Sequence, residues 1–199
     1  MQDVTPVVLL HGELGPGIPD QPFAGRPALL LNDGERRDVS GPGGTGARSA
    51  YNRALDALSR RSRSESELRR WLGDRKYEPG EIDPVIERLT ASGLLDDAKY
   101  AEQFARSRLL YRKLSKRRVL GELSRRGIAR ELAASAVAQV MEDEGLTDSD
   151  GLQAVAERKW RTLSRLDPVV ARRRLMGFLA RRGYDGDAVR QAVKAVTNG

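Results

Sequence analysis

One apolar spacing occurs three times in this chain of 199 residues. In each copy, five apolar residues follow one another at steps of 4, 5, 5 and 4, and equivalent positions lie 51 and then 56 residues apart. The three sets are Leu68, Leu72, Tyr77, Ile82 and Ile86; Val119, Leu123, Ile128, Ala133 and Val137; and Leu175, Leu179, Tyr184, Val189 and Val193. A unit repeated at this length is typical of stacked supersecondary modules.

The steps of four and five predict the local structure of each copy. Two residues four apart share one face of a helix. A step of five across polar residues or glycine leaves that face and indicates a turn. Each copy therefore predicts a helix, a short turn and a second helix, with Tyr77, Ile128 or Tyr184 filling the corner. No stretch alternates apolar and polar residues with a period of two, so we predict no sheet.

Capping residues extend each copy to three helices. Ser64–Glu67 has the pattern of a capping box, and Asp167-Pro168 fits an N-cap followed by the first helical residue. Three helix starts each have two candidate residues: Pro79 or Pro84, Asp96 or Asp97, and Asp148 or Ser149. We predict an all-α fold, a tandem array of three three-helix repeats at 48–95, 96–146 and 147–199, elongated and gently curved.

Residues 1–47 differ from the rest in composition. They hold six of the nine prolines and nine of the twenty glycines, which is too little apolar surface to offset the entropy of an ordered chain. We predict a disordered arm. The Gly41–Gly46 segment has the spacing of a dinucleotide-binding fingerprint, but no strand precedes it and no βαβ unit surrounds it, so we regard the match as accidental.

Several classes of function are excluded by residue type. The chain has no cysteine, and its one histidine, His11, lies in the predicted arm, so thiolate sites, histidine metal sites and histidine triads are excluded. No nucleophile has a base partner and no phosphate loop occurs. We therefore expect no enzyme, no metal and no cofactor. No run approaches the ~18 apolar residues of a membrane span, and no secretory signal is evident, so we expect a cytoplasmic protein.

Positive charge is concentrated outside the arm. The net charge is +7; residues 1–47 carry three basic and six acidic residues, so residues 48–199 carry 32 and 22. Such a body suits a polyanionic partner. Basic residues gather near the second helix of each repeat, and our candidate partner-binding residues are Arg60, Arg61, Arg69, Arg70, Arg75, Lys116, Arg117, Arg118, Arg125, Arg126, Arg173, Arg174, Arg181 and Arg182. The alternative is that each one belongs to a solvated helix face.

Several motifs together resemble the RecX family of recombinase regulators. They are Ser64–Leu68, Gly93–Asp97 followed by Tyr100–Arg108, Leu114–Ile128, Ala156–Trp160 and Leu175–Tyr184. The resemblance covers about residues 50–197 in the family's order. One departure is Lys113–Lys116, where the family commonly carries a glycine-containing turn.

The resemblance implies a function that composition alone does not. It implies tandem three-helix repeats that lie in the groove of a RecA recombinase filament, bridge its protomers and inhibit its activities. We expect a monomer whose arginines contact acidic protomer surfaces, with DNA phosphates as a further candidate partner. Two alternatives are a stand-alone DNA-binding protein of helix-turn-helix type and a purely structural adaptor.

Overall fold

The computed structural model describes residues 49–198, which contain nine α-helices, one π-helical segment and no strand. The α-helices are α1 (Ala50–Arg60), α2 (Glu65–Gly73), α3 (Pro79–Ala91), α4 (Asp97–Arg106), α5 (Lys116–Ser124), α6 (Arg130–Asp143), α7 (Asp148–Leu163), α8 (Pro168–Arg181) and α9 (Gly186–Asn198), and the π-helical segment is η1 (Ser107–Tyr111). The predicted arm, His11 and the Gly41–Gly46 segment lie outside the described residues.

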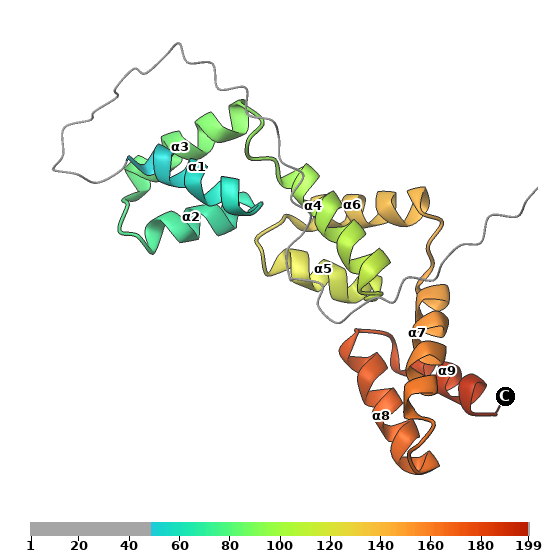
Figure 1. Cartoon of the computed structure of the whole chain (residues 1–199). Coiled ribbons are helices and arrows are strands. Elements are labelled where there is room, and N and C mark those ends of the chain that lie inside the picture. The colour runs from blue at the N-terminus through green and yellow to red at the C-terminus, as the bar shows by residue number, and fades with distance from the viewer. Residues whose placement is uncertain (1–48, 199) are drawn as a thin grey trace, which may run out of the picture.

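The nine α-helices form three consecutive groups, which we call module 1 (α1–α3), module 2 (α4–α6) and module 3 (α7–α9). In Figure 1 they follow one another diagonally, with module 1 at one end and module 3 at the other. Each module has a separate apolar core. The predicted all-α tandem array of three-helix repeats is therefore confirmed.

The repeated apolar residues form these cores. Of the fifteen predicted positions, only Tyr77 is half-buried, and all the others are buried. Leu68, Leu72, Leu123, Leu175 and Leu179 are fully buried, because a step of four keeps two large side chains on the inward face of each second helix. At roughly 25 cal/mol per Å² of apolar surface removed from water, this burial is the main stabilising term in each module.

The turn after each second helix has the geometry that the step of five predicts. Lys76, Gly127 and Gly183 all have positive φ, at 69°, 78° and 88°. The amides of Tyr77 and Ile128 bond back to the carbonyls of Leu72 and Leu123, the long hydrogen bond of a Schellman motif. The turn thereby directs the corner residue inward.

The open helix starts are now settled. The start of α3 is Pro79, the earlier candidate, and Pro84 lies inside the helix. Asp96 is the N-cap of α4, and its side chain accepts from the Lys99 amide. The first helical residue of α7 is Asp148, with Thr147 as its cap. The capping box at Ser64 and Glu67 and the Asp167 cap are both present.

The segment that departs from the family pattern has an unusual backbone. The first helix of module 2 continues from α4 into the π-helical η1, and Lys113 then adopts a positive φ of 48°. This left-handed conformation is the one that glycine adopts most readily. The chain therefore makes the turn with a lysine, and Ser115 caps α5 immediately afterwards.

Candidate functional site

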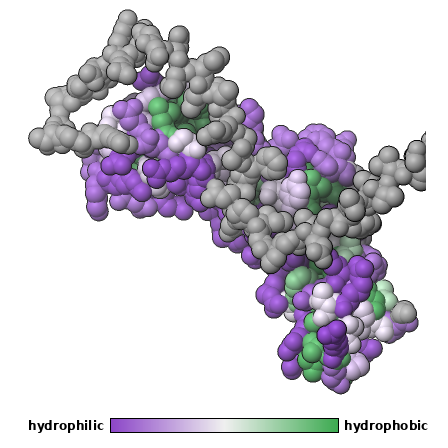
Figure 2. Space-filling view, viewed as in Figure 1, coloured by the Kyte–Doolittle hydropathy of each residue, from purple (hydrophilic) through white to green (hydrophobic). Residues whose placement is uncertain are grey.

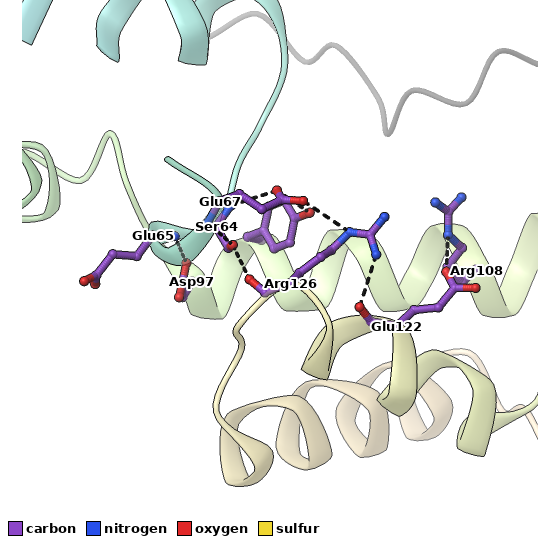
Figure 3. A network of polar contacts seen from close by, with 8 residues as sticks. Ser64, Glu65, Glu67, Asp97, Arg108, Glu122 and Arg126 are labelled. Carbon is purple, nitrogen blue, oxygen red and sulfur yellow. Dashed lines mark hydrogen bonds and ion pairs between the residues drawn. The ribbon is translucent and has the colours of Figure 1, made fainter. Parts of the chain in front are cut away.

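Modules 1 and 2 are joined at Ser64, the N-cap of α2. The buried Ser64 hydroxyl accepts from the Glu67 amide at 3.1 Å and donates to the backbone carbonyl of Arg126 at 2.6 Å (Figure 3). The first amide of α2, on Glu65, donates to the Asp97 carboxylate at 2.8 Å. One module thus satisfies the orphan backbone groups at a helix end of the other. We call this set of contacts the first joint.

Side chains around Glu67 complete the first joint. The Glu67 carboxylate accepts from the Tyr100 hydroxyl at 3.2 Å and lies 3.7 Å from Nε of Arg126. The Arg126 guanidinium in turn stacks 4.3 Å from the centre of the Phe104 ring. Burial, with the Glu67 charge beside it, raises the pKa of Tyr100 to about 12. This tyrosine is therefore neutral at physiological pH and acts as a donor.

Modules 2 and 3 are joined at the equivalent place. The Ser115 amide donates to the Arg182 carbonyl at 3.1 Å, and the Lys116 amide donates to the Asp148 carboxylate at 2.9 Å. The Tyr184 hydroxyl donates to the Lys113 carbonyl at 2.9 Å. Arg117 donates to the carbonyls of Gly183 and Tyr184. We call this set the second joint.

Glycine makes both joints sterically feasible. A Cβ on Gly127 would lie 2.3 Å from the Ser66 Cβ, and a Cβ on Gly183 would lie 2.5 Å from the Arg118 Cβ. Real Cβ atoms do not approach so closely. The two glycines therefore have two roles: they allow the close approach of the neighbouring module, and they provide the positive φ of the turn.

The joints place three second helices head to tail. The C-terminal turn of α8 meets the N-terminus of α5, and the C-terminal turn of α5 meets the N-terminus of α2 (Figure 1). Each contact brings the negative end of one helix dipole to the positive end of the next, which is a favourable arrangement. The joints therefore determine how successive modules are oriented.

Local sequence patterns do not reveal the joint residues. They indicate Asp97 and Asp148 only as candidate helix starts, whereas each carboxylate accepts from the first amide of a helix in the preceding module. A signal was available for the serines, because Ser64 and Ser115 are separated by the same 51 residues as the apolar positions of modules 1 and 2. Asp97 and Asp148 are also 51 residues apart, but they lie in modules 2 and 3, whose apolar positions are 56 apart, so the repeat spacing does not pair them. Polar residues that recur at the repeat offset are candidates for contacts between repeats.

Six of the candidate cations are engaged within the chain. Arg69 pairs with Glu65 and Asp83, and Arg118 pairs with Glu122. Arg117 belongs to the second joint. Arg75, Arg126 and Arg182, which are equivalent by repeat position, stack on the rings of Trp71, Phe104 and Phe178. Burial also lowers the pKa of the Arg182 guanidinium, because the charged form loses solvation.

The other eight candidates are exposed and unengaged. Within residues 49–198 their side chains make no hydrogen bond, ion pair or ring contact. They are Arg60, Arg61, Arg70, Lys116, Arg125, Arg173, Arg174 and Arg181. The visible face of the described modules is mainly hydrophilic, with apolar patches between (Figure 2). An anionic partner can reach these eight cations without breaking an internal contact.

The described residues contain no group of three or more histidine, cysteine, aspartate or glutamate side chains placed to hold a metal ion. Over the same residues, no helix is long and apolar enough to cross a membrane.

Three family models match the chain in order. RecX first, second and third three-helix domains match residues 50–89, 96–137 and 148–193. A regulatory protein RecX of Halorhodospira halophila is 35% identical over 152 residues, covering 76% of this chain and 91% of the relative. A protein of the same description from Mycobacterium sp. (strain KMS) is 36% identical over 138 residues, covering 68% and 74%.

Solved structures share the fold. The crystal structure of RecX from Lactobacillus salivarius matches with a TM-score of 0.59 and 20% identity, over 75% of this chain and 96% of that one. At this identity the match concerns the fold alone. The sequence models and relatives identify the family, and we conclude that the chain belongs to the RecX family.

Proposed function

We propose that this protein binds the filament of a RecA-type recombinase and inhibits its recombinase, ATPase and coprotease activities. Its relatives are described as regulatory proteins, which supports a regulatory rather than a catalytic role. We propose that it acts in the cytoplasm as a monomer, without cofactor.

One observation carries the proposal: two equivalent joints orient three basic modules in a single extended series. Such a body presents cations at intervals along its length, which suits a partner that is itself a repeating assembly. Contacts made by separate modules to neighbouring protomers would add through effective concentration. Stalled filament growth or blocked access of a second DNA molecule is the expected consequence.

The direct test is a titration of recombinase-catalysed strand exchange and ATP hydrolysis with this protein. The informative variant is Lys116→Glu with Arg125→Glu, because both side chains are exposed and unengaged. Arg126 is a poor probe, since its side chain belongs to the first joint. We expect half-inhibition to need at least about tenfold more variant, equivalent to ~1.4 kcal/mol.

The matched control is Lys99→Glu with Arg130→Glu, two exposed charge reversals in the same module and outside the candidate set. It should inhibit like the parent, and all variants should keep their far-ultraviolet circular dichroism. Full inhibition by the double variant would refute the contact assignment. An unmodified protein that leaves the recombinase unaffected, yet binds duplex tightly and with strong salt dependence, would instead identify a stand-alone DNA-binding protein.

A further inference from the structure

Module 3 contains a groove of about 400 Å³ between α7 and α8. Four cations line it, Lys159, Arg173, Arg174 and Arg181, with Gly177 and Phe178 between them. No acidic side chain lines it. The three arginines are exposed and unengaged within residues 49–198, and Lys159 lies 5.2 Å from the centre of the Phe178 ring. We call this the module 3 groove.

The equivalent position in module 2 is neutralised from within. By the 56-residue offset, Glu122 corresponds to Phe178. Counted from the first residues of α4 and α7, Arg108 corresponds to Lys159. Glu122 pairs with Arg108 at 3.3 Å and with Arg118 at 3.0 Å, so these two cations of module 2 are already paired with a carboxylate. Phenylalanine at this position leaves the cations of module 3 without an internal anion, and the two modules are therefore not interchangeable.

Gly177 opens the centre of the module 3 groove. It lies four residues from both Arg173 and Arg181, so all three share one helix face, and the two arginines are about 12 Å apart along the axis. A Cβ at this position would meet only the flexible end of Arg181, at 3.4 Å, so packing does not demand glycine. Its effect is to let a ligand approach the helix backbone between two guanidinium groups.

We propose that the module 3 groove binds the phosphodiester backbone of one nucleic-acid strand. The inference rests on the proposed function, because it names the part of the partner that module 3 contacts. The polar side chains of the groove are all donors, and a phosphodiester backbone presents only acceptor oxygens, to which guanidinium groups bind in pairs. An acidic peptide would also bring backbone N–H donors, and these find no acceptor side chain in the lining.

The groove dimensions favour a single strand over a duplex. A volume of about 400 Å³ holds one backbone, and the cations flank a single groove, with Arg173 and Arg181 on one face of α8 and Lys159 on α7. If all four cations contact phosphates, the logarithm of affinity should fall with the logarithm of salt concentration with a slope of about −3.

The test uses the full chain, without recombinase, and a dye-labelled thymidine oligonucleotide whose anisotropy reports binding. The variant is Gly177→Glu, which places a carboxylate between Arg173 and Arg181 and improves helix propensity, so the protein should fold at least as well. The control is Gly121→Glu, the same charge change at the equivalent position of module 2. We expect Gly177→Glu to weaken binding at least about tenfold and to flatten the salt slope, and Gly121→Glu to change affinity less than about twofold.

Every other outcome overturns the inference. Equal weakening by both variants would indicate diffuse electrostatic attraction, and no weakening by Gly177→Glu would exclude the groove. Stronger competition by duplex or by polyglutamate than by single strand would reject the assigned ligand. Recombinase inhibition is measured separately: inhibition without oligonucleotide binding refutes only the groove, and groove-dependent binding without inhibition refutes only the proposed function.

Discussion

Gly127 carries two constraints, a left-handed backbone and the close approach of Ser66. Replacing it with alanine introduces a left-handed L-residue at about 1–2 kcal/mol and overpacks the first joint at about 1–3 kcal/mol. We expect Gly127→Ala to destabilise the protein by about 2–5 kcal/mol, measured by chemical denaturation.

Lys76 provides the matched control for that substitution. It occupies the equivalent position with φ 69°, but its side chain is exposed, and module 1 is the first module within residues 49–198. Lys76→Gly relieves the backbone while adding entropy to the unfolded chain, so stability should change by less than about 1 kcal/mol. If Lys76→Gly stabilised the protein by as much as Gly127→Ala destabilises it, the turn, rather than the joint, would be what requires glycine.

The two joint tyrosines predict how stability depends on high pH. Burial raises the pKa of both Tyr100 and Tyr184 from 10.0 to about 12. Because the folded pKa is above the unfolded one, the unfolded state loses the phenolic proton first. The stabilisation is complete below pH 10 and is lost as pH rises towards 12, by up to about 1.4 kcal/mol per tyrosine for each pH unit.

Denaturation midpoints between pH 9 and 11 check this prediction. Tyr100→Phe should reduce the pH dependence by about half, although it also loses the hydrogen bond to Glu67. A slope that is unchanged in this variant would assign the alkaline destabilisation to other groups.

Core residues can be predicted from this sequence, whereas residues that join the modules cannot. The spacing predicted the core correctly, because burial depends on periodicity within one helix. The bond from Ser64 to Arg126 joins residues 62 apart in different modules, and no local pattern specifies that pairing. Arg126 and Arg182 carry the same charge as Arg125 and Arg181, and only the structure separates the stacked from the exposed pair.

At the scale of the element, α3 contains a locally unfavourable residue. Pro84 lies in its sixth position, where it has no N–H for the Gly80 carbonyl and its ring crowds that carbonyl. The helix persists because Ile82, Val85, Ile86 and Leu89 bury its inner face. The sequence leaves both starts open, because Asp83-Pro84 suits an N-cap followed by a first helical residue, and an earlier start near Pro79 is also possible.

Pro84→Ala is therefore expected to stabilise the protein. The exposed alanine restores one hydrogen bond and removes the steric conflict, while the unfolded chain gains some entropy. We expect a net gain of about 2 kcal/mol, visible as a higher thermal midpoint. A lower midpoint would contradict this account of α3.

At the scale of the whole molecule, three separate cores are linked by a few mostly polar contacts. Such an array unfolds module by module, and the free energy of unfolding of each module depends on its own core and on its joints. Module 2 has a joint at each end, and modules 1 and 3 have one each. We expect amide hydrogen exchange to show the strongest protection in module 2.

Gly183→Ala should make this modular behaviour visible. The substitution places a Cβ against Arg118 in the second joint and strains the left-handed backbone. Protection should fall throughout module 3 and remain unchanged in module 1. A uniform loss across all three modules would mean that the chain unfolds as a single cooperative unit.

The two ends of the described series lack residues that both joints use. At the module 1 extremity, Lys76 stands where both joints need a bare glycine, so its side chain obstructs any incoming helix end. At the module 3 extremity, α8 begins at Pro168, upstream of Ala171, which replaces the serine used in both joints. Neither end of the described modules therefore offers a second copy of the protein the contact that joins one module to the next.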